Sequence, residues 1–221
     1  MIHTVITESR EQSGRRLPST VWLTMICTRK RWTTVKEWKG ENMDRVKRKE
    51  RILKYRGAIV DVYDDIMEIP DGSTAHWDYI EHRNGAAAVL PVLEDGRVVL
   101  VRQYRSALDQ ETLEIPAGAK EEKEEPSMEC AAREMEEETG YRPGSLEKLI
   151  TVCTTGAFCN ESIDVYLARN LTKTSQHLDR DEFLNVEFWD LDEACSKIYS
   201  MEIKDAKTVS ALLAYKNKYC K

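Results

Sequence analysis

Apolar and polar residues begin to alternate along the chain at Arg51. The stretch ILKYRGAIVDVYDDIMEI, residues 52–69, alternates loosely and is rich in Ile, Val and Tyr, and TAHWDYIEH resumes the alternation after the turn signal PDGS at residues 70–73. Such segments are typical of β-strands joined by a tight turn. The pattern therefore predicts an antiparallel hairpin.

A second hairpin is predicted directly afterwards. GAAAVLPVL and RVVLVRQYR, residues 85–93 and 97–105, are separated by the turn residues EDG. Their nearly continuous apolar runs are typical of strands that are covered on both faces. We expect the core sheet to begin here, near Gly85.

The segment PSMECAAREMEEETG, residues 126–140, has the period of a helix. Met128, Ala131 and Met135 recur at spacings of three and four, Pro126 opens the segment, and Gly140 supplies a C-terminal stop. Further strands are predicted at residues 147–155, 162–171 and 185–191, and amphipathic helices at 192–201 and 205–219. Strands that alternate with a few helices indicate an α/β or α+β layered fold.

The first 45 residues differ from the rest, being basic and rich in Ser, Thr and Arg, with Trp22, Trp32 and Trp38 at no regular period. A disordered extension is expected, with Met43 as an alternative start; a basic amphipathic targeting arm is the other interpretation. The predicted division is an extension at 1–45, a small β subdomain at 46–84 and a main domain at 85–221.

Composition excludes several classes of protein. A net charge of -6 over 221 residues argues against a nucleic-acid binder held by phosphate contacts. The six cysteines form no CxxC pair, which favours free thiols in a reducing cytoplasm. No apolar run approaches the roughly 18 residues needed to cross a bilayer, so no membrane partner is expected.

The predicted helix at 126–140 concentrates negative charge on one side. Glu134, Glu137 and Glu138 share a face, whereas Glu136 points elsewhere. Like charges at this spacing repel, and hard divalent cations prefer carboxylate oxygens, so a metal-bridged phosphate substrate would explain the cluster. The alternative is a solvated acidic face.

This segment resembles the Nudix box. Arg133, Glu134, Met135, Glu137, Glu138, Gly140 and Tyr141 match its second half, and Glu125 stands seven residues before Arg133. One departure lies upstream, because six residues rather than five separate Gly118 from Glu125. Either the loop carries one extra residue, or Ala119 takes the position of the glycine.

The resemblance runs from about Arg51 to the C-terminus and is nearest to the ADP-ribose pyrophosphatase branch of the Nudix hydrolases. VRQYRSALDQETLEIPAG, residues 101–118, and IKDAKTVSALLAY, residues 203–215, are similar to that branch. The resemblance implies an α/β Nudix fold, an α/β/α sandwich with a mixed β-sheet. It also implies that the N-terminal β subdomain exchanges across a homodimer and helps to form the adenine pocket.

The resemblance also implies roles for residues of the box. It assigns the metal ligands to the carbonyl of Ala117 and to Glu134, Glu137 and Glu138. Arg133 and Glu125 would support these ligands through a salt bridge, Arg133 and Glu137 would assist catalysis, and Gly118 and Gly140 would be structural. The implied cofactor is Mg²⁺, with Mn²⁺ as a substitute.

Outside the box, Arg105 is the candidate phosphate contact, since a guanidinium fork matches phosphate oxygens; otherwise it is a surface arginine. Arg102 is a weaker candidate. Trp77 would stack on adenine or belong to the core, and Glu114 would contact substrate, help to hold a second cation or be structural. By resemblance, the catalytic base lies between His177 and Phe188, with Glu182 as the first candidate and Asp181 as its substitute.

The reaction implied is hydrolysis of the diphosphate of ADP-ribose to AMP and ribose 5-phosphate, with two or three Mg²⁺ ions acidifying the attacking water. Rival interpretations keep the chemistry but change the substrate to GDP-mannose, UDP-glucose or NADH. A further rival is a non-catalytic sensor of ADP-ribose or NAD metabolites. At residues 154–162 the loop TTGAFCNES carries Thr155 and Gly156 where ADP-ribose hydrolases usually carry a proline.

Overall fold

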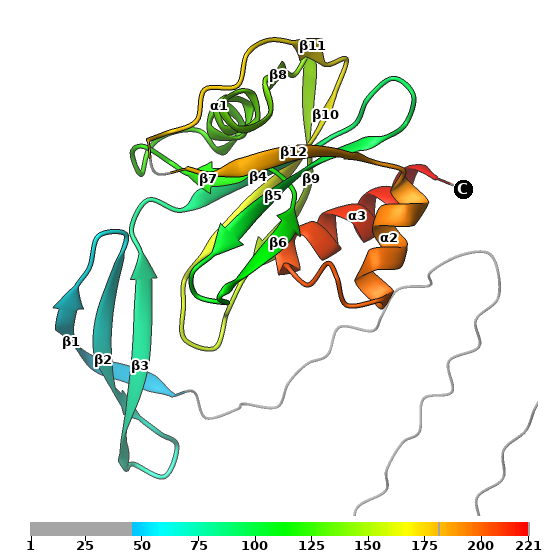
Figure 1. Cartoon of the computed structure of the whole chain (residues 1–221). Helices are drawn as coiled ribbons and strands as arrows, with labels where there is room; N and C mark the ends of the chain where they lie inside the picture. The colour runs from blue at the N-terminus through cyan, green and yellow to red at the C-terminus, as the bar shows by residue number, and fades with distance from the viewer. Residues whose placement is uncertain (1–45, 181, 221) are drawn as a thin grey trace, which may run out of the picture. The chain divides into compact units, whose positions relative to one another are not determined.

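The protein is described by a computed structural model over residues 46–180 and 182–220 (Figure 1), which belong to one compact unit. The predicted disorder of residues 1–45 and the candidate base Asp181 lie outside the described residues.

The N-terminal part is a three-stranded antiparallel sheet of β1 (Lys47–Arg56), β2 (Val60–Glu68) and β3 (Thr74–His82), in that order. The predicted hairpin around residues 70–73 is confirmed, because β2 and β3 pair antiparallel across that turn. The sequence pattern missed only that residues 52–69 contain two strands, since β1 pairs with β2 as well. The chain turns at Gly57, whose N–H donates to the carbonyl oxygen of Val60 at 2.9 Å. A Cβ at Gly57 would lie 2.6 Å from that oxygen, so the turn requires glycine.

The remaining strands form a mixed four-stranded sheet and two smaller sheets. The mixed sheet has the order β7-β4-β10-β9 and consists of β4 (Ala86–Pro91), β7 (Ala117–Ala119), β9 (Ser145–Cys153) and β10 (Ser162–Arg169). Within it, β4 and β10 are parallel and the other pairs antiparallel. The smaller sheets are β12-β5-β6, made of Leu184–Trp189, Val98–Arg105 and Gln110–Glu114, and β11-β8, made of Thr172–Lys173 and Tyr141–Arg142.

The second predicted hairpin is wrong, because β4 and β5 belong to different sheets. The expected turn is present, with Gly96 at φ 87° and the N–H of Leu93 donating to the carbonyl oxygen of Arg97. A single bridge between Val92 and Val98 follows, and the strands then separate. Each strand instead pairs along both edges with other strands: β4 pairs with β7 and β10, and β5 pairs with β12 and β6.

Helices cover both faces of the mixed sheet (Figure 1). On one face, α1 (Ser127–Thr139) contributes Met135 to a buried cluster that contains Val89 of β4. On the other, α3 (Ala206–Tyr219), beside α2 (Leu191–Tyr199), contributes Leu212 to the cluster that contains Leu90. Successive residues of β4 thus face opposite helices. This arrangement is the predicted α/β/α sandwich.

The predicted helix at 126–140 is confirmed as α1. Gly140 ends it in the left-handed conformation, at φ 69°, and its N–H donates to the carbonyl oxygen of Glu136 at 2.9 Å. Among the helices of the described residues, none is long and apolar enough to cross a membrane.

The alternation along β4 yields a stability prediction. Leu90 is fully buried, whereas Leu53 of β1 is 41% exposed. Leu90→Ala should lower the free energy of unfolding by about 2–5 kcal/mol, because it leaves a cavity between the sheet and α3. Leu53→Ala is the matched control and should cost far less. Urea unfolding followed by circular dichroism measures both, and equal losses would contradict the placement of Leu90 in the core.

Candidate active site

The carboxylates of Glu134 and Glu138 on α1 point toward β7. Glu134 and Glu138 are 7% and 3% exposed, and the N–H of Ala117 donates to Oε2 of Glu138 at 3.2 Å. A Cβ on Gly118 would lie 2.0 Å from Cδ of Glu134. Only glycine at this position lets the helix and the strand approach so closely.

Arg133 lies at the centre of the exposed side of this cluster. Its Nη1 donates to Oε1 of Glu134 at 2.8 Å and to Oε2 of Glu137 at 3.0 Å, and its Nε donates to Oε1 of Glu125 at 3.3 Å. Glu136 lies apart and accepts hydrogen bonds from Arg142. Arg133 thus orients one oxygen each of Glu134 and Glu137.

The loop before α1 accommodates its unusual length through a local turn. The N–H of Glu125 donates to the carbonyl oxygen of Glu122 at 3.1 Å, and Oε2 of Glu125 accepts from the N–H of Glu121 at 2.8 Å. Gly118, rather than Ala119, is the residue that lies against Glu134. The extra residue therefore leaves the approach of β7 to the helix intact.

The buried pair carries an excess of negative charge. Burial raises the pKa of Glu134 to about 7, opposed by Arg133. Burial and the neighbouring charge of Glu134 raise the pKa of Glu138 to about 8. The charge of Glu182 also contributes to the rise of both pKa values. A cation at this position would relieve the repulsion.

The donors at this position suit a hard divalent cation, since all are carboxylate oxygens beside the backbone of β7. No three His, Cys, Asp or Glu side chains within residues 46–180 and 182–220 form a ready-made metal cage. Arg133 accounts for this, because it holds oxygens of Glu134 and Glu137 toward its own guanidinium. The donors fit a metal, because Arg133 binds only one oxygen of each of these two carboxylates.

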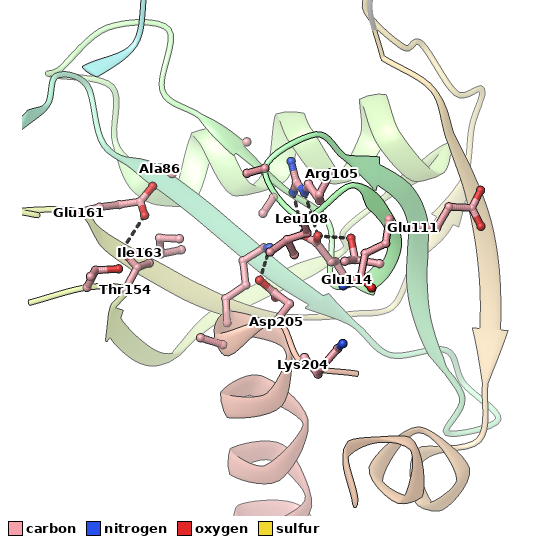
Figure 2. A pocket seen from close by; sticks show the side chains of 18 of the residues that line it. Ala86, Arg105, Leu108, Glu111, Glu114, Thr154, Glu161, Ile163, Lys204 and Asp205 are labelled. Atoms are coloured by element: carbon pink, nitrogen blue, oxygen red, sulfur yellow. Dashed lines mark hydrogen bonds and ion pairs between the residues drawn. The ribbon is translucent and has the colours of Figure 1, made fainter. Parts of the chain in front are cut away.

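A cavity of about 920 Å³ opens on the side of β7, where Ala117 and Gly118 contribute to its lining. Figure 2 shows Thr154 and Glu161 on one side of this cavity and Arg105 and Glu114 on the other. β7 lines the cavity and also contacts Glu134 and Glu138, although the side chains of these two residues do not themselves line it.

Arg105 is held in the cavity by Glu114. Its Nε and Nη2 donate to Oε1 and Oε2 of Glu114 at 2.8 and 2.7 Å. Burial by itself raises the pKa of Glu114. The hydrogen bonds from Arg105 and the charge of Lys207 outweigh this effect and lower the pKa to about 2. The charge of Arg105 also acts on Glu138, where it opposes the rise of the pKa.

The other predicted site residues are not all brought together. Glu182 lies in the loop before β12, where its Oε2 accepts from the N–H of Asp179 at 3.1 Å. Arg102 lines the cavity and pairs with Glu187. Trp77 is 48% exposed on β3 and does not line the cavity of its own chain.

The loop at residues 154–162, which lacks the expected proline, is hydrogen-bonded to the N-terminal sheet. The N–H of Ile80 donates to the carbonyl oxygen of Phe158 at 2.7 Å, and the N–H of His82 donates to Oδ1 of Asn160 at 2.7 Å. Thr155, at the expected proline position, accepts backbone hydrogen bonds from Phe158 and Cys159. The loop therefore joins β3 to the cavity.

Lys207 is a site residue that the sequence reasoning missed. It is 7% exposed, lines the cavity, pairs with Glu114 and lies with its Nζ 3.1 Å from Oδ1 of Asp205. A lysine in the first turn of a helix is unfavourable with the helix dipole. A lysine at this unfavourable position indicates an acidic partner elsewhere in the chain, and this was the feature of the sequence that could have identified it.

Comparisons with known proteins identify several related chains. An ADP-ribose pyrophosphatase of Bacillus subtilis (strain 168) is 38% identical over 166 residues, which cover 74% of this chain and 88% of that protein. A methanol dehydrogenase activator of Bacillus methanolicus is 39% identical over 72% of this chain and 85% of its own length. A crystal structure of an ADP compounds hydrolase superposes with a TM-score of 0.71 at 20% identity, covering 80% of this chain and 95% of that one.

The model of the NUDIX domain matches residues 82–212, more than half of the chain. Together with the structural neighbour, this match confirms the predicted Nudix fold. The chain belongs to the NUDIX domain family.

Proposed function

We propose that the protein hydrolyses the diphosphate bond of ADP-ribose to AMP and ribose 5-phosphate. The observation that carries this proposal is the buried carboxylate pair Glu134 and Glu138, which adjoins, through β7, a cavity that presents Arg105. The 38% identity to an ADP-ribose pyrophosphatase supports ADP-ribose as the substrate.

Nudix hydrolases generally use divalent metals, and we propose Mg²⁺ here, with Mn²⁺ as a substitute. Glu134, Glu138 and Glu137 would hold the metal together with the carbonyl of Ala117, because Glu138 contacts the N–H of Ala117 and Glu134 lies against Gly118. When bound, a divalent cation neutralises the diphosphate and acidifies water. Arg133, paired with Glu125, would keep the ligands in place and receive them when the metal leaves.

Other side chains of this protein would bind the substrate and move the proton. Arg105 would donate to a phosphate oxygen, and Glu182 would accept the proton of the attacking water, since its charge acts on Glu134 and Glu138. Glu114 already accepts hydrogen bonds on both oxygens. It would therefore act by holding Arg105 rather than by contacting substrate.

We also propose the predicted division into a β subdomain at 46–84 and a catalytic domain at 85–221, with the subdomain exchanged in a homodimer. The sheet of β1–β3 exposes several large apolar side chains, which a second chain would cover. They are Leu53, Tyr55, Ile59 and Trp77, which are 41–64% exposed. In such a dimer Trp77 would reach the cavity of the partner. A cytoplasmic location stays a prediction.

A hydrolysis screen with Mg²⁺ tests the substrate. ADP-ribose should have a higher kcat/KM than GDP-mannose, UDP-glucose or NADH, with AMP and ribose 5-phosphate released in equal amounts on chromatography. If another of these compounds is preferred, the proposed substrate is wrong and the proposed reaction type still holds. Binding of ADP-ribose without turnover, with Mn²⁺ also tried, would identify a sensor instead.

Removing one buried carboxylate tests the metal site. Glu138→Gln should lower kcat by at least about 100-fold and abolish the rise in melting temperature that Mg²⁺ produces, because a ligand and its charge are lost. Glu129→Gln is the matched control, since Glu129 is exposed in the first turn of the same helix. If Mg²⁺ stabilises both variants equally, the carboxylates of α1 are not its ligands.

Mixing two variants, one impaired in binding and one in chemistry, tests the exchanged dimer. Trp77→Ala should raise KM for ADP-ribose by about tenfold, since stacking on a base contributes about 1–3 kcal/mol. In a mixed dimer of a Trp77→Ala chain and a Glu138→Gln chain, one site would combine Glu138 of the first chain with Trp77 of the second. Mixing should therefore restore a low-KM component, and sedimentation should show dimers. A monomer, or no restored component after subunit exchange, would contradict the arrangement.

A further inference from the structure

A buried lysine closes the cavity on the side of α3. The side chain of Lys207 is 8% exposed, and its Nζ contacts Oε2 of Glu114 and lies 3.1 Å from Oδ1 of Asp205. Figure 2 shows Asp205 beside the pair of Arg105 and Glu114. Lys207 therefore joins the first turn of α3 to the end of β6.

The position of this lysine is costly by itself. Burial removes water from its ammonium group, and the positive end of the α3 dipole repels it. The helix start needs no lysine, because Asp205 already caps it by accepting from the N–H of Thr208 at 2.9 Å. The hydroxyl of Thr208 also accepts from the N–H of Ile115 at 2.9 Å, which attaches the helix to the strand end. Lys207 is thus dispensable for the cap and for this attachment.

What Lys207 does contact is the carboxylate that holds Arg105. Oε1 of Glu114 accepts from Nε of Arg105 at 2.8 Å and from the hydroxyl of Thr112 at 2.6 Å, and Oε2 accepts from Nη2 of Arg105 at 2.7 Å and from Lys207. Four donors thus determine the plane of the carboxylate. That plane in turn determines the direction of the guanidinium of Arg105, whose side chain is 41% exposed to the cavity.

The charges of this group also balance. Arg105 and Lys207 are positive, and Glu114 and Asp205 are negative. Without Lys207 the group would carry one net negative charge at the position where a diphosphate has to approach. With Lys207, Glu114 is neutralised from the helix side, and the charge of Arg105 remains effective toward an anion.

We propose that Lys207 is a positioning residue for substrate binding, which holds and neutralises Glu114 so that Arg105 presents its free edge to a substrate phosphate. The inference rests on the proposed function, in which Arg105 binds the diphosphate. Lys207 acts through Arg105 and contacts neither the metal ligands of α1 nor the reacting atoms.

A double-mutant cycle tests this route. Lys207→Met should raise KM for ADP-ribose by about tenfold and change kcat by less than about threefold, the pattern of lost binding rather than lost chemistry. Arg105→Met should raise KM at least as much, and the double variant no more than Arg105→Met alone. Lys216→Met is the control, because Lys216 lies on the same helix and pairs with the exposed Asp192. Additive effects of Lys207→Met and Arg105→Met would overturn the proposal.

A second variant separates positioning from folding. Lys207→Met leaves Glu114 short of a buried partner and can lower stability, whereas Glu114→Gln with Lys207→Met removes both buried charges together. The melting temperature should recover in this combination, while KM stays high because Arg105 has lost its carboxylate clamp. If KM returns to the wild-type value together with the melting temperature, Lys207 has only a structural role. An inactive wild-type protein would instead refute the proposed function.

Discussion

The burial of two neighbouring carboxylates on α1 is the constraint on which the site depends. Glu134 and Glu138 lie one turn apart, both nearly without solvent, and each makes the other harder to ionise. Their raised pKa values mean that the unfolded chain gives up these protons at a lower pH than the folded one. The pair therefore reduces stability as pH rises from about 4.5 toward about 8, and a bound cation would reverse this effect.

One short segment contacts both charged groups of the site. Glu114 is clamped by Arg105 and Lys207, the N–H of Ile115 is bound by Thr208 of α3, and Ala117 and Gly118 contact the carboxylates of α1. Residues 114–118 thus connect a helix on each side of the sheet. This segment therefore links the phosphate-binding arginine to the metal-binding carboxylates.

The sequence predicted the parts of the site that are local in the chain. The spacing of Ala131 and Met135 and the stop at Gly140 determine α1, and the same period places Glu134 and Glu138 on one side. Pairing of strands was predicted poorly, because an apolar run such as β4 reports burial and not the identity of its neighbours. Lys207 was missed for a similar reason, since its partner Glu114 lies 93 residues away.

The two sides of the cavity are built by different kinds of contact. Arg105 and Glu114 belong to strands whose register is set by the core, whereas Thr154 and Glu161 belong to a loop fastened to β3 by backbone hydrogen bonds. Substitutions in that loop can reshape one side of the cavity without moving the carboxylates of α1. The fold thereby separates the groups that act on a diphosphate from those that surround the rest of the substrate, so the specificity of the cavity can change while its chemistry is kept.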